Sequence, residues 1–294
     1  MKPRGLTLVE VLIALVILTI LLVIVLPALV QSRERSLRQA CRTNLKTIAI
    51  AIKMYAQDDP NYRWPPVAYL PRHGNPGTPG NWNIDGSFSP CARCLYPNYL
   101  KDVSVWICPA DYAARREEMS AYLESWVDAN GNVNIERLER EADVSYQYLG
   151  WAIWSSAYLH DGHGDSTEVL SAIEKALNYA ATYTDTATFP PEQDIVFPNG
   201  HPNPDARSQT LPRFREGLDR VYVTDTSSFD LPPAQSEIAV MWDRVPPDLA
   251  RFNHSPQGSN VLFADGHVEF VQYPGVFPMS DLFAKVAALR KANP

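Results

Sequence analysis

Two aspartates and two histidines near the C-terminus are of residue types that can bind metal ions: Asp243, His254, Asp265 and His267. If they converge, two carboxylates and two imidazoles could hold a transition metal. A Ca²⁺ site would instead rely on carboxylates and backbone carbonyls. The alternative is structural: Asp265 holds a turn, His254 bonds a loop and His267 is an outward-facing strand residue. The residues alone leave both interpretations open.

The four cysteines offer a second kind of chemistry: Cys41, Cys91, Cys94 and Cys108. An even number favours disulfides in a chain exported from the cytoplasm, and four cysteines allow three pairings. A zinc site of four thiolates is the rival, because Cys91 and Cys94 have the C-x-x-C spacing of zinc ligands. Haem attachment is disfavoured because Leu95 rather than histidine follows Cys94.

Motifs of catalysis are missing from the sequence. It contains no G-x-S-x-G, no H-E-x-x-H and no phosphate-binding glycine loop, so we do not expect an enzyme. The formal net charge is −7, and an acidic surface disfavours general nucleic-acid binding because phosphate repels it. The 25 prolines against 14 glycines predict a loop-rich globular domain.

The element that must position these residues begins at the N-terminus. From Leu6 to Val30 the chain is apolar apart from Glu10, and Lys2 and Arg4 precede it. As a helix this segment would be roughly 37 Å long, which is enough to cross a hydrocarbon core of about 30 Å. The basic flank should stay in the cytoplasm, so the rest of the chain would lie outside.

Glu10 is the exception within this segment. A carboxylate in a membrane helix costs a few kcal/mol and therefore usually has a partner. If the chain is cut after Gly5, the new α-amine of Leu6 in a neighbouring copy could be that partner. The alternative is that the helix dipole alone favours a glutamate near the helix start.

The helix is predicted to continue to Asp58, giving a length of roughly 80 Å. Pro27 should kink or loosen it. Beyond Val30 the apolar residues recur at helical spacing, which predicts a stripe that packs against the globular domain. The stripe consists of Leu37, Cys41, Leu45, Ile48 and Ile52.

The remaining elements predict an α+β fold, in which the long helix packs on a small antiparallel sheet with large loop-rich insertions. Asp265-Gly266 is a strong hairpin signal between two short strands. The expected strands are 145–154, 237–242, 260–264 and 267–272, and the expected later helices are 113–127, 135–142, 166–183 and 280–291. We divide the chain into a leader (1–5), an apolar half-helix (6–30), an amphipathic half-helix (31–58) and a globular domain (59–294) with an insertion at about 112–236.

Gly5-Leu6-Thr7-Leu8-Val9-Glu10 and the apolar run after it resemble the N-terminus of bacterial type IV pilins and type II secretion pseudopilins. In that family a dedicated peptidase cuts after the glycine and methylates the new N-terminal residue. The resemblance implies cleavage and methylation at Gly5/Leu6 and an assembly role for Glu10. Pro27 falls where many of these pilins carry a helix-loosening proline.

Two further segments resemble large pilin-like proteins of planctomycetes and their relatives. One is Cys-Pro-Ala-Asp at 108–111, which in that group accompanies a cysteine in the long helix. We therefore expect Cys41 to pair with Cys108, leaving Cys91 and Cys94 as a local loop. The other is His254 followed by Asp265-Gly266, with one more intervening residue than in that group. Pseudopilins bind Ca²⁺ in a C-terminal loop, so the resemblance favours Ca²⁺ there.

The resemblance implies a structural subunit of an extracellular pilus-like or secretion-like filament. A minor or tip pilin, or an adhesin that binds a surface ligand, is the alternative, and a membrane-anchored extracytoplasmic enzyme is a remote one. The expected partners are other copies of the chain, the prepilin peptidase and the assembly machinery. The precursor should lie in the inner membrane, and the assembled protein at the cell surface.

Overall fold

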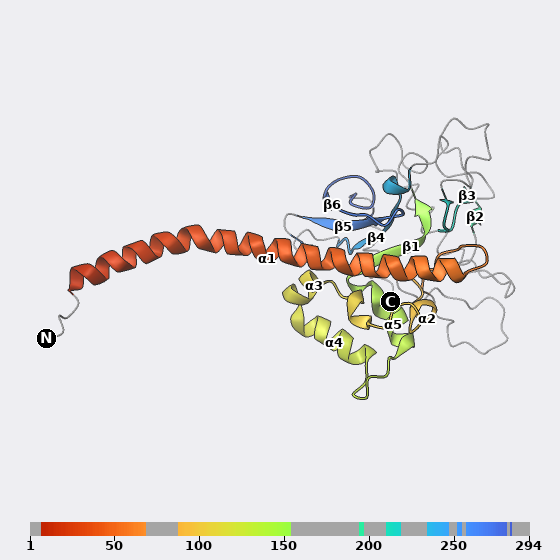
Figure 1. Ribbon diagram of the computed structural model, residues 1–294, viewed down its shortest axis with the longest axis horizontal. Helices are drawn as coiled ribbons and strands as arrows, with labels where there is room; N and C mark the ends of the chain where they lie inside the picture. The colour runs from red at the N-terminus through yellow and green to blue at the C-terminus, as the bar shows by residue number, and fades with distance from the viewer. Residues whose placement is uncertain are drawn as a thin grey trace.

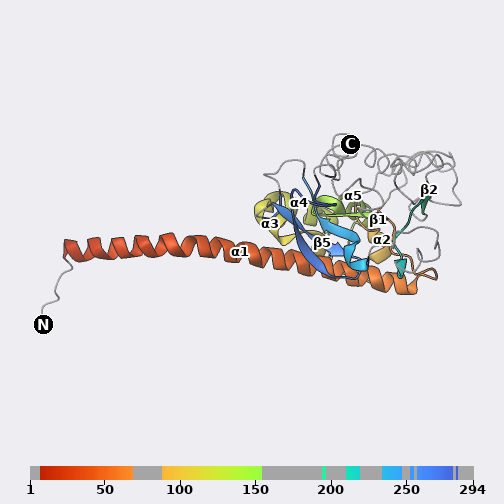
Figure 2. The same ribbon diagram turned by 90° about the horizontal axis from the view of Figure 1, so that it is seen from above.

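One long helix and a globular domain make up the part of the chain that the computed structural model describes (Figure 1). The described residues are 7–68, 88–153, 194–196, 210–218, 234–246, 252–254, 257–280 and 283. Helix α1 (Leu8–Asp58) runs for 51 residues and contains Pro27 without interruption. Its C-terminal half lies along the domain, and its N-terminal half projects away from it (Figures 1 and 2).

A four-stranded antiparallel sheet of order β1-β4-β5-β6 lies on one side of α1 in the view of Figure 1. Its strands are β1 (Tyr146–Ile153), β4 (Ala239–Asp243), β5 (Gly258–Phe263) and β6 (Val268–Gln272). β5 and β6 form the hairpin predicted at Asp265-Gly266, and Gly266 adopts a positive φ of 95° that favours glycine. A separate pair of two-residue strands comprises β2 (Ile195–Val196) and β3 (Thr210–Leu211).

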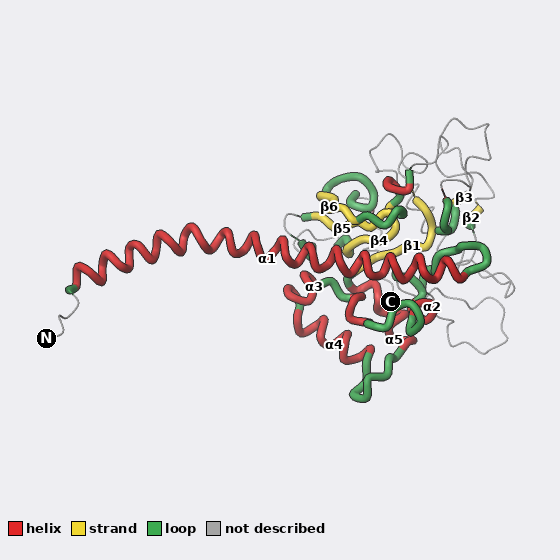
Figure 3. The backbone as a smooth tube through the Cα atoms, in the orientation of Figure 1, coloured by secondary structure: helices red, strands yellow, loops and turns green. Residues whose placement is uncertain are grey.

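In the same view, short helices lie below α1, as the tube in Figure 3 shows, whereas the view from above shows both layers on one side of the helix (Figure 2). They are α2 (Ala92–Leu95), α3 (Pro109–Ala114), α4 (Arg116–Trp126) and α5 (Ile135–Glu141), with 3-10 helices η1 (Val103–Trp106), η2 (Ala142–Val144) and η5 (Gln235–Glu237) elsewhere in the domain. The architecture is therefore α+β, as predicted, with α1 contacting both layers.

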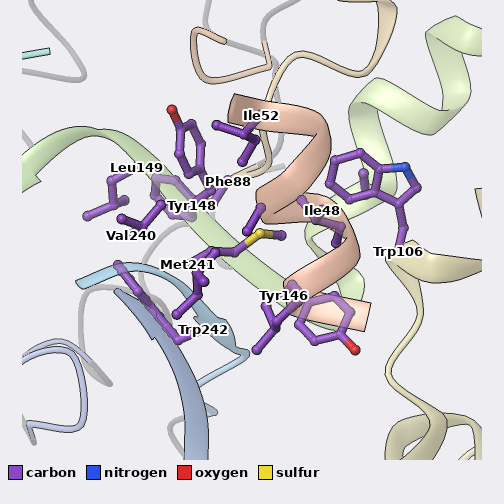
Figure 4. Close-up of a cluster of buried hydrophobic side chains, with 14 of the residues drawn as sticks. Ile48, Ile52, Phe88, Trp106, Tyr146, Tyr148, Leu149, Val240, Met241 and Trp242 are labelled. Atoms are coloured by element: carbon purple, nitrogen blue, oxygen red, sulfur yellow. The ribbon is translucent and has the colours of Figure 1, made fainter. Parts of the chain in front are cut away.

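The core lies where α1 meets the sheet. Ile48 and Ile52 of α1 are buried in one cluster with Tyr146, Tyr148 and Met241 from the strands, and Trp106 of this cluster lies on the other side of the helix from Tyr148 (Figure 4). Four of the five predicted stripe residues are fully buried: Cys41, Leu45, Ile48 and Ile52. Leu37, the fifth, is partly buried against the same core. The helical spacing thus identified the face of α1 that packs against the domain.

One predicted helix is divided in the structure. The segment expected as a single helix, 113–127, forms α3 and α4, because Arg115 leaves the helical conformation at φ −130° and ψ 51°. The Arg115 guanidinium pairs with Asp111, whose carboxylate is buried and also accepts from Ser145. A buried carboxylate needs such partners. The predicted helix 166–183 and nearly all of 280–291 lie outside the described residues.

Candidate functional site

The start of α1 carries the first group of predicted site residues. Thr7 is its N-cap, and with Glu10 it forms a capping box. The Glu10 carboxylate accepts from the backbone N–H and the hydroxyl of Thr7, both at 2.8 Å, and Thr7 Oγ1 accepts from Glu10 N at 3.3 Å. In the single chain Glu10 therefore stabilises the helix start. Gly5 and Leu6, the predicted cleavage residues, lie outside the described residues.

The apolar half of α1 is uncovered. Its large apolar side chains from Leu8 to Val30 are 46 to 78% exposed. The helix contains an 18-residue window long and apolar enough to cross a membrane, and none of that window is buried. Pro27 lies at the end of this half and its side chain is exposed as well. Contiguous exposed apolar surface of this extent marks a membrane or protein interface.

Polar contacts fasten the second half of α1 to the domain. The Asn44 side-chain amide donates to the carbonyl of Ile107 at 3.0 Å. The Arg38 guanidinium lies 4.1 Å from the centre of the Phe270 ring on β6, a cation–π contact. Near the end of α1, Tyr99 donates to Asp58 at 2.6 Å. Contacts at both ends of this half, together with the buried stripe, fix the helix relative to the domain.

All four cysteines form disulfides, with the pairing expected from the resemblance. Cys41 of α1 is joined to Cys108, the N-cap of α3, and Cys91 is joined to Cys94 across the start of α2. The first bridge ties the long helix to the domain across 67 positions. The second closes a loop of three positions, beside the ion pair that the half-exposed Arg93 makes with the buried Glu139 carboxylate.

His254 lies at the centre of a buried polar network between α1 and the sheet. Its Nε2 is 3.0 Å from Asp243 Oδ2, 3.2 Å from Asn260 Nδ2 and 3.8 Å from Cys108 Sγ. Its Nδ1 is 3.3 Å from Glu34 Oε1 on α1. Asp243 Oδ2 also accepts from the backbone N and the side-chain Nδ2 of Asn260, both at 2.8 Å. The network thus joins α1, β4, β5 and the segment that precedes β5.

Two electrostatic features distinguish this network. Burial lowers the pKa of His254, but hydrogen bonding to Asp243 and the charges of Asp243 and Glu34 raise it by more, so that the net shift is upward. The imidazolium form is favoured because it faces two carboxylates. The other carboxylate oxygen, Asp243 Oδ1, is buried and has no hydrogen-bond partner within the part of the chain that the structure describes. A buried carboxylate oxygen without a donor is unusual.

Asp265 and His267 lie elsewhere, in the β5–β6 turn. Asp265 Oδ1 accepts from His267 N at 2.9 Å and is 2.6 Å from His267 Nδ1. The His267 ring stacks on Phe263, with their centres 4.5 Å apart. Burial raises the pKa of Asp265, but hydrogen bonds from His267 and nearby positive charge lower it by more. These contacts match the structural interpretation in which Asp265 holds the turn.

The structure therefore corrects the expectation that the four metal-binding candidates converge. Asn260, which binds Asp243, is separated from the turn by the last three residues of β5, a strand length of about 10 Å. His254 precedes β5 whereas Asp265 follows it. The candidates form two pairs, because the length of β5 separates the open end of the hairpin from its turn.

Asp243 was predicted as a partner of His254, but two other residues that contact His254, Glu34 and Asn260, are not singled out by the sequence pattern. Asn260 was expected only as the first residue of a strand. Glu34 is 220 residues from His254 in the sequence, and the place of Asn260 beside Asp243 depends on the register of β5 against β4. Both contacts therefore arise only in the tertiary fold. Among the described residues, the ligand-bearing group is Cys41, Cys108, Asp243 and His254, whose ligand atoms lie within 4.8 Å of one another.

Comparison with known families gives one match. Residues 1–26 match the prokaryotic N-terminal methylation motif. No curated protein and no solved structure matches the chain. The matched segment contains Gly5, Leu6 and Glu10 and ends within the exposed apolar half of α1.

This match, with the apolar half-helix and the α+β domain, supports a precursor of the type IV pilin or pseudopilin kind. The motif implies processing by a prepilin peptidase and handling by the associated assembly machinery. It also supports a membrane-anchored precursor.

Proposed function

We propose that the protein is a structural subunit of an extracellular filament, assembled through the apolar half of α1 after cleavage between Gly5 and Leu6. The observation that carries this proposal is the division of α1 into two halves. Every large apolar side chain from Leu8 to Val30 is exposed, whereas the stripe from Cys41 to Ile52 is buried in the domain. Water is a poor solvent for the first half, so lipid must cover it before assembly and other copies of the helix after it.

The attachment of the domain to α1 would allow force to pass from the helix to the domain. The Cys41–Cys108 bridge, the buried stripe and the Asn44 and Arg38 contacts hold the second half of α1 against both layers of the domain. A pull on the apolar half is therefore transmitted to the domain through covalent and packed contacts. A subunit anchored in a filament core needs this property.

Glu10 would act at the assembly step. In the single chain its carboxylate is bound to Thr7. In the filament, the Leu6 amine of a neighbouring copy would compete for that carboxylate, because an opposite charge in an apolar surrounding is a stronger partner than a neutral donor. The leader must be removed for this amine to exist, which links cleavage at Gly5 to assembly.

Substitutions at Glu10 separate the two roles. Glu10→Gln keeps the side-chain acceptor of a capping box but removes the charge, so we expect normal precursor levels and loss of most sheared filaments. Glu10→Asp keeps the charge, and Thr7→Ala removes the cap but leaves Glu10 in place. Both should retain more filament than Glu10→Gln. The measurement is the amount of this chain in sheared surface material relative to cell-associated chain.

The result would contradict the charge-based role if Glu10→Gln assembled normally. It would point to capping alone if Thr7→Ala were as defective as Glu10→Gln.

Mass spectrometry of the assembled chain should give an N-terminus at Leu6 carrying a methyl group, and Met1 in assembled material would refute processing. A subunit that dominates sheared filaments is a major pilin, whereas a trace component in filaments built of another chain is a minor or tip pilin.

A further inference from the structure

The group formed by Cys41, Cys108, Asp243 and His254, here called the His254 cluster, contains the donor set of a metal site. Its four ligand atoms are buried and lie within 4.8 Å of one another. The residues come from α1, the N-cap of α3, the end of β4 and the segment before β5. In the structure the two sulfurs are bonded to each other, so the cluster is occupied by a disulfide.

Two distances between ligand atoms of the cluster are close to those of tetrahedral zinc. Zinc–ligand bonds of 2.0 to 2.3 Å place neighbouring ligand atoms about 3.3 to 3.8 Å apart. His254 Nε2 is 3.0 Å from Asp243 Oδ2 and 3.8 Å from Cys108 Sγ. The two sulfurs, about 2.05 Å apart in a disulfide, would have to separate by about 1.7 Å. Two thiolates, an imidazole and a carboxylate are ligands that Zn²⁺ accepts.

Two independent features of the surroundings point to a cation. His254 Nδ1 faces the Glu34 carboxylate at 3.3 Å, and such a carboxylate behind the imidazole is the usual partner of a metal-binding histidine because it orients the other nitrogen toward the metal. Among the described residues, buried Asp243 Oδ1 has no hydrogen-bond partner, although Oδ2 of the same carboxylate accepts from Asn260. One oxygen of this carboxylate therefore lacks the donor that a buried carboxylate oxygen usually has.

The second cysteine pair provides an internal comparison. Cys91 Sγ also lies near a buried carboxylate, 3.7 Å from Glu139 Oε1. There, however, the Arg93 guanidinium and backbone N–H donate to both oxygens of Glu139. That carboxylate is neutralised by a guanidinium, which keeps its proton, whereas Asp243 faces His254, whose imidazole can lose its proton to a metal. The C-x-x-C pair, which has the zinc-like spacing in the sequence, therefore has the less suitable surroundings.

We propose that the His254 cluster binds one Zn²⁺ when Cys41 and Cys108 are reduced, through both thiolates, His254 Nε2 and the Asp243 carboxylate. Binding displaces one proton from each thiol and requires the neutral imidazole. The metal and the disulfide are alternative closures of the same junction, and either one fastens α1 to the domain. This inference does not depend on the filament role.

The exchange between the two closures balances with a protein disulfide as oxidant. One zinc-bound thiolate attacks that disulfide, breaks its S–S bond and forms a mixed disulfide, which releases the first thiolate of the oxidant. The other thiolate then attacks the chain's own sulfur in the mixed disulfide, so that the Cys41–Cys108 bond forms and the second thiolate of the oxidant leaves; the two released thiolates carry the two electrons and take up protons from water. Zn²⁺ then leaves, because the disulfide sulfurs no longer carry charge. Holding Cys41 and Cys108 together on one metal before oxidation would disfavour mispairing with Cys91 or Cys94.

The test uses the full chain in detergent micelles with Cys91 and Cys94 replaced by alanine. The protein is reduced with a phosphine and titrated with Co²⁺, whose thiolate charge-transfer and d–d absorption bands report tetrahedral coordination. We expect one equivalent to bind to the reduced chain, to be displaced by Zn²⁺, and not to bind to the oxidised chain. Glu34→Gln keeps all four ligands and should weaken binding by about 10- to 100-fold.

Variants of the ligands decide whether the site is the one described. His254→Ala and Asp243→Asn should abolish the tetrahedral spectrum, whereas His267→Ala, which removes a histidine outside the cluster, should not change it. If the reduced chain loses its near-ultraviolet circular dichroism, adding Zn²⁺ should restore it. The proposal is overturned if the reduced chain binds no metal, if Zn²⁺ fails to restore a lost signal, or if His254→Ala binds as tightly as the parent.

Discussion

Two isoleucines of α1, two positions apart, differ strongly in the exposure of their side chains. Ile48 is fully buried, whereas Ile50 of the same helix is 61% exposed. Truncating a buried isoleucine leaves a cavity and costs about 2 to 5 kcal/mol, so Ile48→Ala should lower the denaturant midpoint of the domain markedly. Ile50→Ala should change stability by about 0.5 kcal/mol or less. Tryptophan fluorescence of the full chain in detergent measures both.

If the two alanine variants unfolded at the same denaturant concentration, the helix would not be packed on the domain by the face described. A loss confined to Ile50→Ala would point to a different rotation of α1.

Asp59, directly after α1, carries a pH-dependent contribution to stability. Its Oδ1 accepts from the backbone of Asn61 and Arg63, and its Oδ2 pairs with the Arg63 guanidinium at 3.1 Å. Burial raises the pKa of Asp59, but these bonds and the charge of Arg63 lower it by more. A lowered folded-state pKa gives stability that is present above the unfolded value of about 3.9 and is lost as pH falls through the folded value.

Asp59→Asn should therefore destabilise the domain at pH 7 by about 1 kcal/mol or less after allowance for solvent, and the difference from the parent should vanish at low pH. Melting temperatures of the two chains, measured from neutral pH to below pH 4, test this. A difference that stayed constant with pH would show that the carboxylate charge has no part in it.

At the scale of elements, the two disulfides should differ in their effect. Loop-closure entropy gives about 4 kcal/mol for the 67-position Cys41–Cys108 separation and about 1.5 kcal/mol for the three-position Cys91–Cys94 separation. Replacing both cysteines of the first pair by alanine should thus lower the melting temperature much more than replacing both of the second. The second double variant is the matched control. Equal losses would mean that α1 stays attached without its covalent bridge.

Elements with a strong periodic signal could be predicted from the sequence. The length of α1, its buried stripe and the hairpin at Asp265-Gly266 follow from local patterns, because helix period and turn chemistry are short-range properties. The break at Arg115 could not be predicted, because the sequence around it contains no proline or glycine that would mark the end of a helix.

The predicted site residues divide in the same way, into those marked by a local pattern and those that depend on long-range contacts. Gly5, Leu6 and Glu10 belong to a contiguous motif that a sequence can display. The His254 cluster depends on the register of β4 and β5 and on the packing of α1 against them, so the sequence pointed to Asp243 and His254 but attached them to the wrong partners. Metal-ligand spacing along the chain favoured Cys91 and Cys94, whereas the tertiary structure favours Cys41 and Cys108.

At the scale of the whole molecule, the basic leader and the apolar half of α1 predict the orientation of the precursor. If Lys2 and Arg4 stay in the cytoplasm, we expect the globular domain on the outer side of the inner membrane. Protease added to intact spheroplasts should therefore degrade the domain while leaving a cytoplasmic marker intact. A domain that becomes sensitive only after the membrane is permeabilised would contradict this orientation.

The unbroken course of α1 has a consequence for how the surface of an assembly is laid out. Because residues 8–58 form one helix, the azimuth of the domain around the helix axis is set by the number of residues between its apolar half and its buried stripe. Each residue contributes about 100° of rotation and 1.5 Å of rise. Inserting one residue between Val30 and Leu37 would turn the domain by more than a quarter of a revolution, whereas inserting seven would return it to within about 20°. The length of α1 between Val30 and Leu37 thus sets the angle of the domain about the helix. In a filament, it would determine which face of the domain points away from the filament axis.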